Sequence, residues 1–538
     1  MKVSCTLVSV AALLPFSGSN AGNVQRDKSQ RPNIVLVIAD DMGWGDVGYQ
    51  GAVDVSTPNI DALARRGVQF SQGYVSCSIS GPSRAGILTG VYQQRFGFYN
   101  NLHPWAKIPE GQSTLGEMVR DCGYATGFVG KWHMADSPEQ SPNRRGFDQF
   151  YGFWSDTHDY YRSTDKPGVE LYDFCPLYRN GEIQPPLHES GEYITDCFTR
   201  EAVEFIDKHA SSPFLLCLSY NAVHSPWQVP EHYVNRLEGR RFHHEDRKVF
   251  AAMVLALDDG IGRVMESLRK NGLEENTLFI LISDNGSPRG QGIECSTGYE
   301  YKDRGNTTMS SPGPFRGYKA DTYEGGIRVP YIMSWPSELP QGMVYDNPVI
   351  SLDIFPTVMQ AVGGTSRQKY SLDGVSLLPY LKSEWPIDKR PHSTLYWRRD
   401  EDFAIRKGDW KLVYNDQGST RKIQLFDMKD DKEEVYDLSG EYPELADSLL
   451  AEFDAWDAAL PPCTNQTTWN GRVVVEPKEP QPVSRNFRYK EGYRRKVSEH
   501  NRRIYDAKYR RSVIGESFKL PYKGKSVSYT HLRAHETS

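Results

Sequence analysis

Residues 34–39 read IVLVIA, a continuous run of apolar and mostly β-branched side chains that stops at Asp40-Asp41. Such a run is typical of a strand buried on both faces, as at the centre of a parallel sheet. Three later runs have the same character: YATGFVGKWH at 124–133, PFLLCLSY at 213–220 and TLFILIS at 277–283. Helical patterns lie between them, around 198–207 and 250–269. Strands that alternate with helices predict an α/β domain with a mostly parallel sheet between helices.

The first helix carries its own boundary signals. In TPNIDALARRG, Thr57 is a suitable N-cap, Pro58 a suitable first residue, and Gly67 follows the end. Near residue 390 the pattern changes to short alternating runs, which predict antiparallel strands, and residues 443–460 read as an amphipathic helix. We therefore expect a large N-terminal domain over 22–390 and a smaller C-terminal α+β domain with an antiparallel sheet over 391–470.

The N-terminus has the form of a signal peptide over residues 1–21. Lys2 precedes an apolar stretch, Val3 to Phe16, which is too short to span a bilayer, and the small residues Ser19-Asn20-Ala21 suit cleavage. No other segment is apolar enough to span a bilayer, so we expect an exported protein, periplasmic or secreted, without stable membrane insertion. Scattered cysteines, seven after cleavage, indicate neither a disulfide framework nor a zinc cluster, although one or two bridges stay open.

The C-terminal region differs in charge from the rest. The whole chain has a net charge of -6, which argues against a general nucleic-acid-binding protein. Residues 485–525 nevertheless hold 14 Lys or Arg against 4 Asp or Glu, so 471–525 is expected to be a basic extension. A solvated surface is its simplest interpretation, and contact with an anionic glycan is the alternative. Residues 526–538 fit nothing before them and are set apart as a non-native tail.

Polar residues follow two of the predicted strands. Asp40-Asp41 ends the first, and Asp284-Asn285 ends the run TLFILIS. Neighbouring strand residues face opposite sides, so both members can reach one point only where the chain turns, which Gly43 and Gly286 would permit. These oxygen ligands suit a hard cation, Ca²⁺ or Mg²⁺. Taken singly, each pair is more simply explained as a cap of the following turn.

Cationic residues lie at comparable positions. Lys131 and His133 end GKWH and share a strand face at positions i and i+2, while His224 and Lys319 lie in loops. Together with an arginine they would form an anion pocket, although each alone is more simply a surface group. In SGPSRAGILTG, a helix capped by Gly81 would have Pro82 at N1, Arg84 at N3 and Ser80 at its positive end. A serine without an activating base is a weak nucleophile.

These segments together resemble the formylglycine-dependent type I sulfatases of the alkaline phosphatase superfamily. SGPSRAGILTG at 80–90 is similar to the family signature in its serine-type form, and the resemblance spans residues 31–455. The other matching motifs follow in the family's order: NIVLVIADDMGWGD, STPNIDALARRGV, YATGFVGKWH, RGFDQFYGF, NAVHSP, FILISDNG and RGYKADTYEGGIRVP. Met134-Ala135 stands where the family often has Leu-Gly.

The resemblance implies a mechanism and its cofactors. Ser80 would be oxidised to formylglycine by a radical-SAM sulfatase-maturing enzyme, and the hydrated aldehyde would attack the sulfur of a sulfate monoester. The cation, usually Ca²⁺ with Mg²⁺ as the alternative, would be held by residue 80 and by Asp40, Asp41, Asp284 and Asn285.

The resemblance also implies roles for the cationic residues. Lys131, His224 and Lys319 would hold the sulfate oxygens, and His224 or Lys319 would protonate the leaving oxygen. Arg84 would stabilise the charge of the nucleophile. His133 would deprotonate the second hydroxyl and release sulfate.

The expected substrate is a sulfated polysaccharide or its oligosaccharides. Sugar subsites are expected at His158 and Arg162 in the aromatic segment 153–174, and at Trp397 and Arg398 in YWRRDED. An aromatic domain contact is an equally good interpretation of both segments. Two other functions stay open: a phosphate or phosphonate monoester hydrolase of the same superfamily, and a non-catalytic glycan-binding protein with unmodified Ser80.

Overall fold

The computed structural model describes residues 31–99, 101, 108–134, 138–165, 175–242, 245–288, 309–386, 388–400, 402–415 and 423–461, and the backbone of 526–528. The expected signal peptide, the basic extension 471–525 and residues 529–538 lie outside the described residues. So does the stretch 166–174 of the predicted sugar-binding segment.

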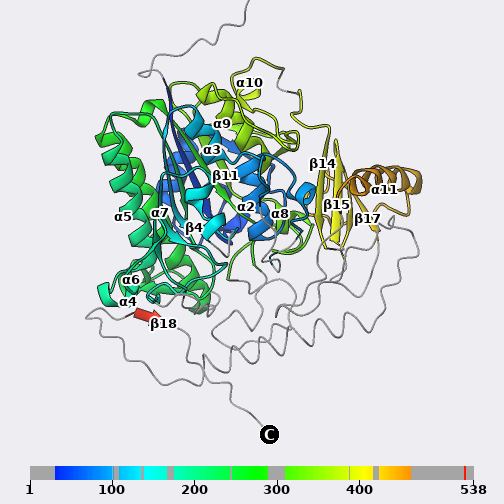
Figure 1. Ribbon diagram of the computed structural model, residues 1–538. Coiled ribbons are helices and arrows are strands. Elements are labelled where there is room, and N and C mark those ends of the chain that lie inside the picture. The colour runs from blue at the N-terminus through cyan, green and yellow to red at the C-terminus, as the bar shows by residue number, and fades with distance from the viewer. Residues whose placement is uncertain are drawn as a thin grey trace, which may run out of the picture.

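A ten-stranded sheet runs through the molecule (Figure 1). The four predicted buried strands form its centre in the order β10-β1-β8-β4, and all three of these pairings are parallel. On one side of this centre, β11 is antiparallel to β10; on the other side, β5 is parallel to β4 and β6 is antiparallel to β5. In sheet order, the strands are β12 Met343–Tyr345, β2 Val68–Phe70, β11 Tyr331–Ser334, β10 Thr277–Ser283, β1 Asn33–Ala39, β8 Phe214–Ser219, β4 Ala125–Lys131, β5 Gln149–Phe153, β6 Tyr178–Arg179 and β7 Glu182–Ile183.

Helices cover both faces of this sheet. Ile34 and Leu36 of β1 pack in one cluster with α2, α3 and α9, whereas Val35 and Val37 pack in another with α1, α5 and α7. The alternation of the strand therefore explains why its run is apolar throughout. These helices are α1 Pro58–Arg65, α2 Ser80–Thr89, α3 Leu115–Asp121, α5 Ile194–Lys208, α7 Glu245–Lys270 and α9 Ile354–Val362.

A second, antiparallel sheet of four strands carries the C-terminal part of the fold: β14 Thr394–Arg399, β15 Asp402–Lys407, β16 Trp410–Tyr414 and β17 Ile423–Asp427. Helix α11, Pro443–Ala458, packs on one face of it through Leu449 and Phe453. The opposite face packs against the main core through Ala404 and Val413. Figure 1 shows α11 on the outer side of this sheet. The predicted fold class, a mostly parallel α/β domain followed by an antiparallel α+β part, is confirmed.

Short elements complete the described fold. Strands β3 Gly73–Tyr74 and β13 Val349–Ile350 pair in parallel, and β9 Gln228–Pro230 pairs with β18 Ser526–Ser528. The tail that the sequence sets apart thus contributes one short backbone pairing. The remaining short helices are α4 Leu187–Ser190, α6 Glu231–Asn235, α8 Glu324–Ile327 and α10 Leu378–Leu381.

Two further expectations concern caps and cysteines. Helix α1 begins at Pro58 after Thr57, as predicted, but the Thr57 hydroxyl does not bind a helix amide; it donates to Asp61 Oδ1 at 2.9 Å. Among the described residues, Cys77, Cys122, Cys197 and Cys217 are free thiols. No helix in the described part of the chain is long and apolar enough to cross a bilayer.

Candidate active site

The two acidic pairs meet at the carboxyl edge of the central strands. Ala39 of β1 is in register with Ser283 of β10, so the residues that follow each strand are neighbours. The backbone N–H of Asp41 donates to Asp284 Oδ1 at 3.3 Å, and Asn285 Nδ2 donates to Asp41 Oδ1 at 2.7 Å. The side chains of Asp40, Asp41, Asp284 and Asn285 are all buried.

The turn that brings each pair together differs from the expected one. Asp41 itself adopts a left-handed backbone with φ of 61°, which turns the chain out of β1. Gly43 has φ of -68°, and it is needed for close approach instead: a Cβ there would lie 2.3 Å from the Ser311 carbonyl oxygen. A Cβ on Gly286 would lie 2.0 Å from the Gly325 carbonyl oxygen.

Ser80 lies directly beside both pairs. Its hydroxyl oxygen is 2.9 Å from Asn285 Oδ1 and 3.4 Å from Asp40 Oδ1, and the side chain is buried. The predicted Gly81 cap is wrong, because α2 begins at Ser80 itself, after Ile79 in an extended conformation. The Gly81 N–H donates to Asn101 Oδ1 at 2.9 Å, a contact that nothing in the local sequence signals.

Each buried carboxylate of the cluster has a cationic neighbour. Lys131 Nζ lies 2.5 Å from Asp40 Oδ2, and Lys319 Nζ lies 2.7 Å from Asp41 Oδ1. Arg84 Nε donates to Asp284 Oδ2 at 2.8 Å.

His224 and Lys319 form the open side of the site. His224 Nε2 is 3.6 Å from Asp41 Oδ2. The side chains of His224 and Lys319 are each 15% exposed, so a ligand would approach from their side.

Arg84 is fixed by a residue that the sequence analysis did not identify. Its Nη1 donates to the Lys131 carbonyl oxygen at 3.1 Å and also contacts Ser219 Oγ. Ser219 is the last residue of β8, so the strand-end argument used for the acidic pairs would have found it.

His133 reaches the site by a different route from the predicted one. With φ of 60° its backbone is left-handed, so it does not continue the alternation of β4 and does not share a strand face with Lys131. Its Nδ1 is buried without a hydrogen-bond partner among the described residues. Burial, followed by the positive charges of Lys131 and Arg84, holds the pKa of His133 well below its usual value. The imidazole is therefore neutral near pH 7 and able to accept a proton.

The charges of the site act in opposite directions on its carboxyls. Burial alone would raise the pKa of Asp40 and Asp41, but the nearby cations, Lys131 for the first and Lys319 for the second, lower both. The pKa of Asp284 is raised by burial and then by the charge of Asp40. Three carboxyls thus lie close together, and the nearby cations lower the pKa of Asp40 and Asp41 but not that of Asp284.

This cluster fits a divalent cation. Ligand atoms of Asp40, Asp41 and His224 lie within 4.8 Å of one another. With Asp284, Asn285 and Ser80 the donors are mainly oxygen atoms, which suits a hard cation. The crowding of three buried carboxyls, which leaves the pKa of Asp284 raised despite its contact with Arg84, is the physical reason for a cation to bind there.

Two predicted sugar contacts are wrong. His158 is 1% exposed, and its Nε2 lies 3.1 Å from the Cys175 carbonyl oxygen. Trp397 is also 1% exposed, and its Nε1 donates to the Val75 carbonyl oxygen at 2.7 Å. Both side chains are internal, and the aromatic face of Trp397 belongs to the contact between the small sheet and the main core.

The other two predicted sugar contacts lie at the surface. Arg162 is half-buried, and the described part of its segment ends three residues later, at residue 165. Arg398 forms an ion pair of 2.5 Å with Asp457, and its side chain is 12% exposed.

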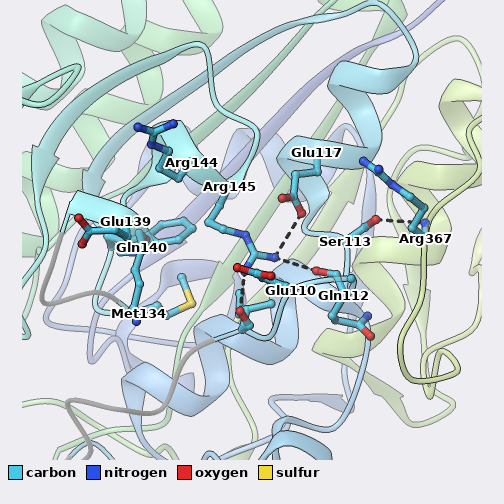
Figure 2. A pocket seen from close by; sticks show the side chains of 13 residues that line it. Glu110, Gln112, Ser113, Glu117, Met134, Glu139, Gln140, Arg144, Arg145 and Arg367 are labelled. Carbon is cyan, nitrogen blue, oxygen red and sulfur yellow. Dashed lines mark hydrogen bonds and ion pairs between the residues drawn. The ribbon is translucent and has the colours of Figure 1, made fainter.

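A separate pocket of about 340 Å³ lies beside the loop that follows β4. Figure 2 shows Arg145 at its centre, bound to Glu117 and to the Gln112 carbonyl oxygen. Trp132 and Met134, on either side of His133, line this pocket, but none of the predicted catalytic residues does. The pocket therefore contacts the two sequence neighbours of His133 and is distinct from the Ser80 cluster.

Comparison with known proteins identifies the family. The family described as Sulfatase matches residues 32–364, more than half of the chain, and the one described as N-sulphoglucosamine sulphohydrolase, C-terminal, matches 318–455. An N-acetylgalactosamine-6-sulfatase of Mus musculus is 32% identical over 403 residues, 71% of this chain and 72% of that protein. The uncharacterized sulfatase YdeN of Escherichia coli (strain K12) is 30% identical over 443 residues, 74% of this chain and 72% of that protein.

Solved structures agree. Ps i-CgsB, in complex with k-i-k-neocarrahexaose, has a TM-score of 0.71 and 33% identity and covers 81% of this chain and 94% of its own. The phosphonate monoester hydrolase of Agrobacterium radiobacter has a TM-score of 0.55 and 19% identity over 79% of this chain and 96% of its own, a likeness of fold alone. The chain thus belongs to the sulfatase family of the alkaline phosphatase superfamily and is a sulfuric ester hydrolase.

Proposed function

We propose that this sulfatase hydrolyses sulfate monoesters on a sulfated polysaccharide or its oligosaccharides, and that its nucleophile derives from Ser80. The observation that carries the proposal is the position of the Ser80 hydroxyl, 2.9 Å from Asn285 Oδ1 and inside a ring of cations. A serine hydroxyl is a weak nucleophile, and the carboxylate within reach of this one, Asp40 at 3.4 Å, is already paired with Lys131. Oxidation to formylglycine by a radical-SAM maturase would supply a hydrated aldehyde, with one hydroxyl to attack sulfur and a second to release sulfate.

The side chains around Ser80 have separate tasks in this proposal. Lys319 and His224 bind the sulfate oxygens from the open side, and the buried Lys131 binds them from inside the site. His224 or Lys319 gives a proton to the leaving sugar oxygen, because both lie at the exposed rim. His133, whose neutral imidazole has an unpartnered Nδ1, accepts the proton of the second hydroxyl. Arg84 stabilises negative charge at the nucleophile.

Asp40, Asp41, Asp284, Asn285 and residue 80 would hold Ca²⁺, with Mg²⁺ as the alternative. The cation would supply positive charge next to the nucleophilic oxygen and so stabilise its ionised form.

Two comparisons support a glycan substrate. One relative is named an N-acetylgalactosamine-6-sulfatase, and one structural neighbour binds k-i-k-neocarrahexaose. Arg162 and Arg398 remain the proposed sugar or sulfate contacts. We also propose an exported location, periplasmic or secreted, on the basis of residues 1–21; N-terminal sequencing of the exported mature protein would test the cleavage after Ala21.

The first test uses protein produced together with a radical-SAM sulfatase-maturing enzyme. Release of inorganic sulfate is measured over a panel of defined sulfated oligosaccharides, and the peptide containing residue 80 is analysed by mass spectrometry. We expect that peptide to lack two hydrogen atoms and at least one oligosaccharide to lose sulfate. Unmodified Ser80 in active protein would refute the mechanism.

The matching variant is Ser80→Ala. It removes the oxygen that becomes the nucleophile and leaves a small side chain in the first turn of α2, so we expect sulfate release to fall to background while the unfolding temperature stays close to that of the unmodified protein. Near-normal turnover by this variant would be incompatible with the proposal.

The same panel separates the two alternatives. A phosphate or phosphonate monoester hydrolase would turn over those esters faster than the sulfate esters. A glycan-binding protein with unmodified Ser80 would bind oligosaccharides without releasing sulfate.

A further inference from the structure

The loop that carries Lys319, here called the lysine loop (residues 316–327), contacts the segments that hold Asp41, Ser80 and Asn285. Its backbone forms hydrogen bonds with Ser287, which follows Asn285-Gly286, and with Ser78, two positions before Ser80. These bonds are Lys319 N–H to the Ser287 carbonyl oxygen at 2.6 Å, Ala320 N–H to the Ser78 carbonyl oxygen at 2.8 Å, and Gly286 N–H to the Gly326 carbonyl oxygen at 3.0 Å. A shift of this loop would therefore move Lys319 relative to the nucleophile and the acidic pairs.

The other side of the lysine loop is held by the small C-terminal sheet. Glu324, fully buried, accepts from Lys411 Nζ of β16 at 2.8 Å through Oε1. Its Oε2 accepts from Tyr74 O–H at 2.7 Å and lies 3.2 Å from Arg328 Nη1. Lys411 also lies 2.8 Å from Glu434 Oε1, and Glu434 Oε2 accepts the Glu324 N–H at 2.7 Å.

Lys411 is the central cation of this cluster. Its side chain is fully buried and contacts two carboxylates, Glu324 in the lysine loop and Glu434 after β17. Buried carboxylates that lose a partner are costly, and they relieve that cost by moving toward water or another donor. If the Lys411 contacts were lost, Glu434 would lose a buried cationic partner and Glu324 would keep the weaker ion pair with Arg328, so the link between the small sheet and the lysine loop is costly to break.

We propose that Lys411 is a positioning residue for sulfate ester hydrolysis: through Glu324 it fixes the lysine loop and keeps Lys319 in place beside Asp41. The inference rests on the proposed role of Lys319 in binding the sulfate group. It assigns to the C-terminal sheet a part in catalysis that needs no contact between Lys411 and the substrate.

Four variants test this inference. Lys411→Met removes the charge but keeps much of the length, and Lys411→Arg keeps the charge. Lys411→Met combined with Glu434→Gln removes one carboxylate together with the cation, so that a folded protein is obtained even if the single variant unfolds. Lys407→Met in the neighbouring strand is the control, because Lys407 is 55% exposed and pairs with Glu452 at the surface.

For each folded variant, three quantities are measured: kcat on a sulfate ester, inhibition by inorganic sulfate, and the crystallographic distance from Lys319 Nζ to Asp41. We expect Lys411→Met and the double variant to lower kcat by roughly 10- to 100-fold, the effect of a displacement of about 1 Å. Sulfate inhibition should weaken by a similar factor, Lys319 should move away from Asp41, Lys411→Arg should recover part of the activity, and Lys407→Met should match the unmodified enzyme.

Two results would overturn the inference. One is a folded double variant with kcat within twofold of the unmodified enzyme. The other is a low kcat with Lys319 still in contact with Asp41, because the loss would then have another cause. If the unmodified enzyme released sulfate from no ester, the proposed function would fail, whereas the position of Lys319 in the variants would still decide this inference.

Discussion

Close backbone approach, at the scale of single residues, gives the acidic cluster its shape. Gly286 follows Asp284-Asn285, and its N–H donates to the Gly326 carbonyl oxygen at 3.0 Å, which brings the end of β10 against the lysine loop. A Cβ at position 286 would lie 2.0 Å from the Gly325 carbonyl oxygen, so any side chain there would separate the two segments. Both neighbours are backbone atoms, which cannot move aside as a flexible side chain can.

Gly286→Ala should therefore damage the site more than the fold. We expect kcat to fall by at least about 10-fold, because a shift near 1 Å at a catalytic group costs up to about 10²-fold. The circular dichroism spectrum should stay unchanged. Gly440→Ala is the matched control, since a Cβ there meets no atom within 4 Å. Equal activity of the two variants would mean that the close approach at Gly286 does not position the site.

The residues that meet at the candidate site could be predicted one by one, but the backbone geometry that brings them together could not. The predicted ligands and cations converge because strand ends and loops of one sheet edge must meet there. The left-handed conformations of Asp41 and His133 carry no local signal, since neither residue is a glycine. Trp397 failed as a sugar contact for a related reason: an aromatic residue at a domain contact has the same sequence appearance as one at a glycan surface.

At the scale of elements, helix α1 is capped from another helix. Asp258 of α7 accepts the N–H of Ile60 at 2.8 Å and the side-chain amide of Asn59 at 2.8 Å, in the position where the Thr57 hydroxyl was expected. A carboxylate at a helix N-terminus is favourable, but this one is fully buried. Burial outweighs the hydrogen bonds and raises the pKa of Asp258 to about 6.

This cap predicts a dependence of stability on pH. Between its unfolded pKa near 3.8 and its folded pKa near 6, Asp258 keeps a proton in the folded protein that the unfolded chain loses. The free energy of unfolding should therefore fall as pH rises through this window, by up to about 3 kcal/mol. Asp258→Asn lacks the titrating group, and the Asn59 amide can rotate to bond the new amide.

Denaturant unfolding of both proteins at pH 4.0, 5.0 and 6.5 measures the difference between them. The stability of the unmodified protein relative to Asp258→Asn should decrease with each step. A constant difference, or one that grows with pH, would contradict the raised pKa.

Most elements were predictable because their apolar periodicity is strong. The four central strands and the helices α5, α7 and α11 follow their sequence patterns. The start of α2 was wrong by two residues, because the first four amides of a helix need no acceptor within it, and Pro82 is tolerated at its third position as well as at its first. A contact such as that of Asp258 with α1 links residues 198 positions apart, and no local pattern encodes it.

At the scale of the whole molecule, the small sheet is packed on both faces, and the candidate active site lies at one edge of the large sheet. Phe403 and Ile405 of β15 face α11, whereas Ala404 between them faces the main core. The C-terminal part therefore shares its core with the domain that holds Ser80, and it supports the lysine loop through Lys411. The expected domain boundary near residue 390 is consequently a change of sheet within one continuous packing arrangement.

The acidic cluster holds three buried carboxyls close together, so a bound cation should stabilise the folded molecule as a whole. Lys131, Lys319 and Arg84 lie beside these carboxyls, yet burial and the charge of Asp40 still raise the pKa of Asp284, so further positive charge is favourable there. A cation that binds the folded state alone contributes about 2.7 kcal/mol at 100 times its dissociation constant. We therefore expect removal of Ca²⁺ by a chelator to lower both the unfolding temperature and sulfate release, and added Ca²⁺ to restore them.

Asp284→Asn makes that expectation specific to the site. The variant removes one of the three carboxyls at which the cation would bind, so its unfolding temperature should respond weakly or not at all to Ca²⁺. Asp430→Asn, an exposed change near the end of β17, should respond as the unmodified protein does. Asp284→Asn removes repulsion from Asp40 but also takes the 2.8 Å carboxylate partner from the buried Arg84, so its stability in chelator reflects both effects. The difference in stability between the unmodified protein and Asp284→Asn should therefore be larger in Ca²⁺ than in chelator. A difference that Ca²⁺ does not change would show that the cluster is held together by Lys131, Lys319 and Arg84 alone.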